Sequence, residues 1–205
     1  MKIETLILGP YETNCYLVHN EEKEAFIIDP ASNGDKIKEV LDANHLDLKF
    51  IILTHAHGDH IGALAELMEA YSVPVYLHKE ELATLYDQDM SLSSLMNINL
   101  PEKSSQLVTV EDGQEITFGQ ETLRFIHGPG HTPGGMSIYI KPCLFTGDTL
   151  FCGSIGRTDF PGGNYPEIIA SCHKLTSYPA DTIILPGHGP RSLVSQEKMM
   201  NPFLA

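Results

Sequence analysis

The chain has 205 residues, of which 42% are hydrophobic, and this is enough for one globular domain with a sizeable core. Its 13 basic and 27 acidic residues give a net charge of −14, which argues against a nucleic-acid partner because such surfaces need a basic stripe. No apolar run approaches the roughly 18 residues of a membrane-spanning helix, and the N-terminus has no signal-peptide pattern. We therefore expect a cytoplasmic protein without a membrane partner.

Short apolar strands alternate with helical patterns along the chain. In chain order, the first half predicts strands over 2–8, 15–19, 25–28, 50–53 and 73–77, and helices over 34–44, 61–70 and 79–86. The polar stretch 87–103 is interpreted as a connecting loop or short helix, with a lid as the alternative. The second half predicts strands over 106–110, 115–118, 122–126, 136–140, 144–146 and 182–185, and a helix over 166–175. Two comparable halves predict an α/β fold in which helices cover two facing sheets, within a single domain of residues 1–205.

The segment 55–60 is dense in metal-ligand residue types and comes soon after the apolar run 50–53. His55 and His57 are two positions apart, so in an extended segment both imidazoles leave the same face and can reach one metal ion. Asp59 and His60 lie at the turn into a helix and point elsewhere, towards a second ion or towards groups that support the first. Thr54 is a candidate hydrogen-bond partner for an imidazole N–H group. The alternative is a set of surface histidines with Asp59 as a helix cap.

Three later apolar runs also end in candidate ligands, after glycine or proline turns. These ligands are His131, Asp148 and His188. Each alone has an ordinary interpretation as a turn or loop residue. Because the same arrangement of strand, turn and ligand recurs, the sequence predicts one shared metal site.

These residues, in this order, resemble the metal ligands of the metallo-β-lactamase superfamily. The resemblance extends over nearly the whole chain and implies a four-layer αββα sandwich with two mixed sheets covered by helices. It implies that His55, His57 and His131 bind a first metal ion. It implies that Asp59, His60 and His188 bind a second, and that Asp148 bridges both. A carboxylate at the bridging position argues against a true β-lactamase.

Within the superfamily, the segments 128–134 and 147–160 are similar to those of the glyoxalase II group, the hydroxyacylglutathione hydrolases. Only 17 residues follow His188, too few for the C-terminal helical domain that helps full-length members bind glutathione. The chain therefore resembles a short form without that domain. The string 156–160 also resembles the persulfide dioxygenases, which use the fold with a single iron.

Two divalent ions about 3.5–4 Å apart can polarise a carbonyl and lower the pKa of a bridging water to about 7. The hydroxide so formed can attack a thioester, so we expect a metal-dependent hydrolase acting on glutathione thioesters such as S-lactoylglutathione. Asp59 and Asp148 are the expected catalytic residues. The nitrogen and oxygen ligands suit two zinc ions, with iron or manganese as alternatives. The alternative function is a mononuclear iron dioxygenase acting on glutathione persulfide.

Arg157 lies in a glycine-rich loop and is the candidate substrate-binding residue, because its guanidinium could clamp a substrate carboxylate. A structural salt bridge to Asp159 is the alternative. The four cysteines form no Cys-x-x-Cys pair, so we expect free thiols and, for Cys152, a structural and unreactive role.

Overall fold

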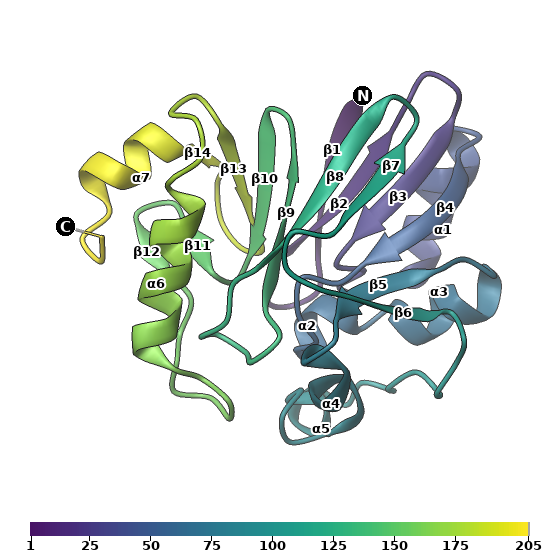
Figure 1. Cartoon of the computed structure of the whole chain (residues 1–205). Coiled ribbons are helices and arrows are strands. Elements are labelled where there is room, and N and C mark those ends of the chain that lie inside the picture. Colours follow the sequence, from purple (N-terminus) through teal and green to yellow (C-terminus); the bar gives the residue numbers. More distant parts are fainter. Residues whose placement is uncertain (205) are drawn as a thin grey trace. The chain divides into compact units, whose positions relative to one another are not determined.

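The computed structural model describes residues 1–204, which form two compact units (Figure 1). The first unit comprises residues 1–77 and 82–109, and the second comprises residues 78–81 together with the chain from Val110 onward. The prediction of a single domain stays a prediction. In residues 1–204, no helix has both the length and the apolar character needed to cross a bilayer.

The sheet of the first unit has its strands in chain order. They are β1 (Lys2–Leu8), β2 (Thr13–His19), β3 (Glu24–Ile28), β4 (Asp47–Ile52), β5 (Val75–His78) and β6 (Leu107–Val110). The pairs β1–β2 and β2–β3 are antiparallel, whereas β3, β4 and β5 run parallel. The carboxyl ends of β3, β4 and β5 therefore lie at the same edge of this sheet. Segment 55–60 starts at this edge, shortly after the end of β4.

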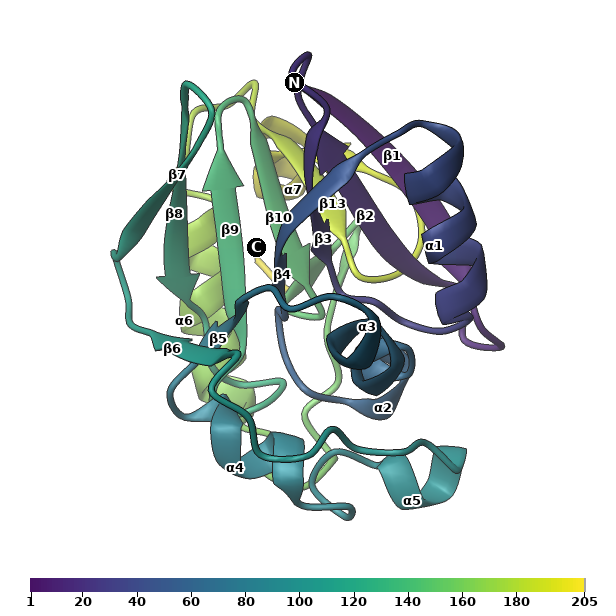
Figure 2. The ribbon, with the colours of Figure 1, turned by 90° about the vertical axis from the view of Figure 1, so that its right-hand side faces the viewer.

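Five helices belong wholly or mainly to this unit. They are α1 (Gly34–Ala43), α2 (Gly58–Ile61), α3 (Leu64–Ala70), α4 (Glu81–Tyr86) and α5 (Ser93–Met96). The Asn33 side chain accepts from Lys36 N and caps α1. Ile37 of α1 and Leu64 of α3 are fully buried in the same core cluster as Ile51 of β4, so both helices cover one face of the sheet (Figures 1 and 2).

The sheet of the second unit has the order β14-β13-β10-β9-β8-β7. Its strands are β7 (Glu115–Phe118), β8 (Glu121–His127), β9 (Met136–Ile140), β10 (Cys143–Gly147), β13 (Ile183–Pro186) and β14 (Ser192–Leu193). β10 and β13 are parallel, while β9 is antiparallel to both β8 and β10. β8, β10 and β13 consequently run in the same direction, and their carboxyl ends share one edge.

Two helices and a small hairpin complete the second unit. Helix α6 (Tyr165–Leu175) packs Ile168 against Ile126 and Leu144 of the sheet, and helix α7 (Val194–Met200) follows β14. The hairpin of β11 (Leu150–Phe151) and β12 (Ser154–Ile155) has the exposed Cys152 in its turn. In α7 the buried Glu197 carboxylate accepts from Gly153 N at 2.9 Å and so holds this turn.

The predicted strands are all observed, with ends that differ by no more than three residues. The predicted helix 61–70 is wrong as a continuous element, because the chain forms α2 and α3 with a break at Gly62 and Ala63. Ala63 N donates to Pro30 O at 2.9 Å instead of to its own helix, and a side chain at Gly62 would collide with the Ala31 carbonyl oxygen. The stretch 87–103 contains the short helix α5, and α7, β11, β12 and β14 were not expected.

Candidate metal centre

The first unit holds four of the predicted ligands. His55 and His57 lie in the loop after β4, and both are buried, with 2% of their surface exposed. Asp59 and His60 lie in α2, where the His60 ring is fully buried. The His60 Nε2 and Asp59 Oδ2 atoms are 3.6 Å apart, and Thr13 Oγ1 donates to the same Asp59 oxygen at 3.3 Å.

Asp29 holds two of these imidazoles in place through hydrogen bonds. The sequence analysis did not identify this residue as part of the site. Asp29 follows β3 and is buried, with 1% of its surface exposed. Its carboxylate accepts from Thr54 N at 2.7 Å, from Thr54 Oγ1 at 2.6 Å and from His60 Nδ1 at 2.9 Å. Because the Thr54 hydroxyl donates to Asp29, its oxygen accepts from His55 Nδ1 at 3.1 Å. Both His55 and His60 are therefore oriented with Nε2 as the ligand atom, which fits metal binding. The expected support from Thr54 is confirmed.

The second unit holds the other three predicted ligands at the carboxyl ends of parallel strands. His131 follows β8, Asp148 follows β10 directly and His188 follows β13. His131 is buried, whereas 11% of the Asp148 side chain and 28% of the His188 side chain are exposed. This placement agrees with the predicted arrangement of strand, turn and ligand within this unit.

Asp148 Oδ2 lies 3.6 Å from His131 Nε2 and 3.5 Å from His188 Nε2. These separations are too long for hydrogen bonds. They match the spacing of two atoms bound to one ion, which is about 3.4 Å for tetrahedral ligands with bonds of about 2.1 Å. The donor set of imidazole nitrogens and carboxylate oxygens thus fits divalent metal ions.

The loop that carries His131 is fixed by two contacts within the second unit. His131 Nδ1 donates to Arg157 O at 2.8 Å, which makes Nε2 the ligand atom. The fully buried Glu81 carboxylate accepts from Thr132 Oγ1 and from Gly134 N, both at 2.9 Å. Glu81 is the second residue that sequence reasoning missed, because it lies about fifty positions from the loop that it holds.

Arg157 forms the salt bridge that was the alternative to substrate binding. Its Nε and Nη2 donate to the two oxygens of Asp159 at 2.8 and 2.7 Å, and the guanidinium stacks on Phe160 at 3.7 Å. The Arg157 guanidinium holds the pKa of the Asp159 carboxyl at about 2. Both side chains are more than half exposed, and substrate binding by Arg157 stays a prediction.

Comparison with known proteins assigns the family. The sequence profile of the metallo-β-lactamase superfamily matches residues 8–188. The chain belongs to the metallo-β-lactamase superfamily. Its two mixed sheets flanked by helices are the metallo-β-lactamase fold, as the sequence predicted. The protein is a metal-dependent hydrolase of this superfamily.

Two relatives align over nearly their full length. A probable metallo-hydrolase of Bacillus subtilis, YqgX, is 39% identical over all of this chain and 98% of its own. The hydroxyacylglutathione hydrolase GloC of Haemophilus influenzae is 36% identical over all of this chain and 98% of its own.

Two solved structures of superfamily members are also similar. The BLEG-1 B3 metallo-β-lactamase has a TM-score of 0.92 and 40% identity, with all of both chains covered. TTHA1623, solved in a di-iron-bound form, has a TM-score of 0.88 and 36% identity, with 98% of this chain and all of its own covered.

Proposed function

We propose that the two ligand sets jointly bind two divalent metal ions. In this assignment His55, His57 and His131 hold one ion, and Asp59, His60 and His188 hold the other. Asp148 is assigned to both, which is supported by the near-equal distances from its Oδ2 to His131 and His188. Zinc suits the donor set, and iron is the alternative because the similar TTHA1623 structure contains two iron ions.

The substrate class that we infer is a glutathione thioester such as S-lactoylglutathione. It is supported by the GloC relative, whose name is hydroxyacylglutathione hydrolase. Two such ions, when bound, would polarise the thioester carbonyl and would lower the pKa of water, so that hydroxide would be available at neutral pH. Hydrolysis breaks the C–S bond and releases the thiol and the carboxylic acid.

The residues of the chain position the reactants. The Thr13 hydroxyl fixes the Asp59 carboxylate, which orients the attacking water and accepts its proton. Asp29 keeps the His55 and His60 rings in place through the buried hydrogen bonds described above. No side-chain nucleophile is needed, because water supplies the oxygen.

A substrate panel tests this function. Purified protein loaded with zinc or iron is incubated with S-lactoylglutathione, with a chromogenic cephalosporin and with glutathione persulfide in the presence of oxygen. We expect release of glutathione from the thioester without oxygen uptake. Turnover of the cephalosporin alone, or persulfide-dependent oxygen uptake with one iron per chain, would overturn the proposal.

A further inference from the structure

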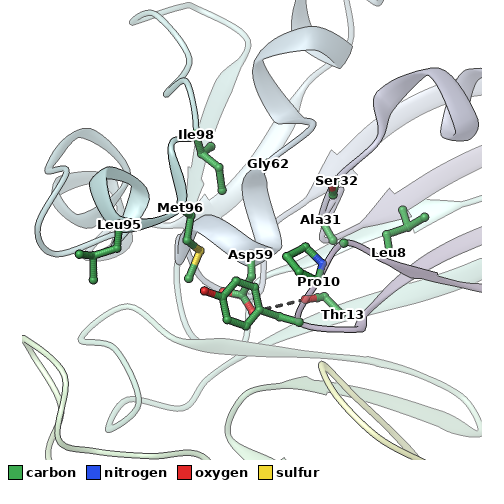
Figure 3. Close-up of a pocket in the computed structure, with 12 residues that line it drawn as sticks. Leu8, Pro10, Thr13, Ala31, Ser32, Asp59, Gly62, Leu95, Met96 and Ile98 are labelled. Atoms are coloured by element: carbon green, nitrogen blue, oxygen red, sulfur yellow. Dashed lines mark hydrogen bonds between the residues drawn. The ribbon is translucent and has the colours of Figure 1, made fainter.

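A cavity of about 330 Å³ lies beside Asp59 within the first unit (Figure 3). Leu8, Pro10 and Ala31 line it on one side, and the side that faces them is formed by a short segment of the chain. This segment is residues 91–98, which contributes Leu95, Met96 and Ile98. The volume is at the lower end for ligand pockets, and so it suits one small moiety of a substrate.

The segment 91–98 is anchored to the metal-binding motif itself. Gly58 N donates to Ser91 O at 2.7 Å. A Cβ atom at position 58 would stand 2.9 Å from Met96 Sδ and 3.0 Å from Ile98 Cδ1. Because Gly58 has no side chain, Met96 and Ile98 can pack against the backbone at this position. The apolar wall is therefore built into the site next to Asp59.

The chemistry of the lining selects which part of a thioester can enter. Asp59 is the only charged residue among those that line the cavity within the described chain. The described lining residues include no cationic side chain that could pair with the carboxylates of glutathione, whereas an uncharged hydrocarbon chain gains free energy by leaving water. The Leu95 side chain is apolar and 81% exposed, so a bound hydrocarbon chain would also cover it.

We propose that this cavity binds the acyl group of the substrate, and that the preferred acyl group is an apolar chain longer than lactoyl. This inference rests on the proposed thioester hydrolase function and defines its substrate more narrowly. The acyl carbonyl lies at the Asp59 end, and the hydrocarbon tail runs between Pro10 and Met96.

A series of straight-chain acylglutathiones from acetyl to octanoyl tests the inference. We expect kcat/KM to rise with each methylene, by at most about fourfold, until the cavity is full. Binding of S-alkylglutathione thioethers, measured by calorimetry, should tighten with chain length in the same way. This second readout does not depend on turnover.

Two substitutions of exposed apolar residues distinguish an effect of a new charge at the cavity from the effect of a new charge elsewhere on the surface. Leu95→Asp should lower the ratio of kcat/KM for octanoyl over acetyl thioester, because it places a carboxylate on the apolar wall. Met199→Asp is the matched control, since Met199 lies in α7, is 78% exposed and does not line the cavity. Met96→Ala should shift the preferred chain length upwards, because it enlarges the cavity.

The outcomes distinguish this inference from the proposed function. Thioester hydrolysis with no dependence on chain length, or equal effects of Leu95→Asp and Met199→Asp on the ratio, would overturn the acyl pocket and leave the hydrolase function intact. Tighter binding of longer thioethers, without hydrolysis of any thioester, would support the pocket and overturn the thioesterase.

Discussion

Asp29 has a left-handed backbone conformation, with φ of 52°, and a buried carboxylate that accepts three hydrogen bonds. Two of these bonds reach imidazoles, one directly at His60 and one through the Thr54 hydroxyl. Such contacts set the ring orientation and raise the basicity of metal-binding histidines. Asp29 is therefore not one of the assigned metal ligands, but its hydrogen bonds fix the ring orientation of two of them, His55 and His60.

Asp29→Asn should weaken metal binding by about 10- to 100-fold, since the carboxylate charge that orients His60 is lost. Asparagine tolerates the left-handed conformation, so the fold should survive. Competition with a chelating indicator measures the affinity. Asp35→Asn is the control, because that side chain is 82% exposed in the first turn of α1. Equal affinities for the two variants would contradict the role of Asp29.

Asp148→Ala should abolish essentially all turnover, because it removes the carboxylate that we assign to both ions. His45→Ala and His173→Ala should keep activity near that of the unchanged protein, since both side chains are exposed and belong to neither ligand set. Steady-state kinetics on metal-loaded proteins measures this. If Asp148→Ala kept full turnover, the dinuclear assignment would be wrong.

Glu81 is the first residue of helix α4, and within the second unit its side chain forms the connection to the loop that carries His131. Glu81→Ala should lower the free energy of unfolding by about 1–3 kcal/mol, because Thr132 Oγ1 and Gly134 N lose a buried acceptor. Urea denaturation measures the change. The control is Glu80→Ala, because Glu80 is the neighbouring residue and is exposed. We expect it to change the free energy of unfolding by less than about 0.5 kcal/mol. Similar losses for both variants would rule out this connection.

Within the second unit, His78 at the end of β5 and His127 at the end of β8 form a stacked pair of imidazoles, with centroids 3.8 Å apart and planes at 11°. Burial, and then the proximity of His127, lower the pKa of His78 to about 4. An unfolded histidine has a pKa of about 6.5, so the unfolded chain binds this proton first as the pH falls. The stabilisation is therefore present above pH 6.5 and is lost as the pH falls through about 4.

His78→Gln should flatten the loss of stability between pH 6.5 and 4, because the variant no longer binds this proton on unfolding. Urea midpoints at a series of pH values measure the slope. His173→Gln, at an exposed position of α6, should keep the slope of the unchanged protein. A slope that His78→Gln leaves unaltered would contradict the lowered pKa.

The sequence predicted the long buried strands and the strand-end ligands because both have strong local signals. The break between α2 and α3 could not be predicted, since it depends on a distant carbonyl, that of Pro30. The strands β11, β12 and β14 have two residues each, too few for a hydrophobic period. Asp29 also follows a buried strand and has the same pattern as the recognised ligands, so this signal could have found it. Glu81 had no such signal.

For the whole molecule, the comparison with known proteins establishes the superfamily, while the number of ions and the substrate remain our proposals. The net charge of −14 is unfavourable for an anionic glutathione substrate, and two dications would offset part of it. The number of ions bound is therefore central to the account.

Titration of metal-free protein with zinc, followed by the rate of thioester hydrolysis, tests this claim most directly. We predict that the rate rises to a plateau at two equivalents of metal per chain, with two ions bound by elemental analysis. A plateau at one equivalent, or no hydrolysis with two ions bound, would contradict the dinuclear thioesterase.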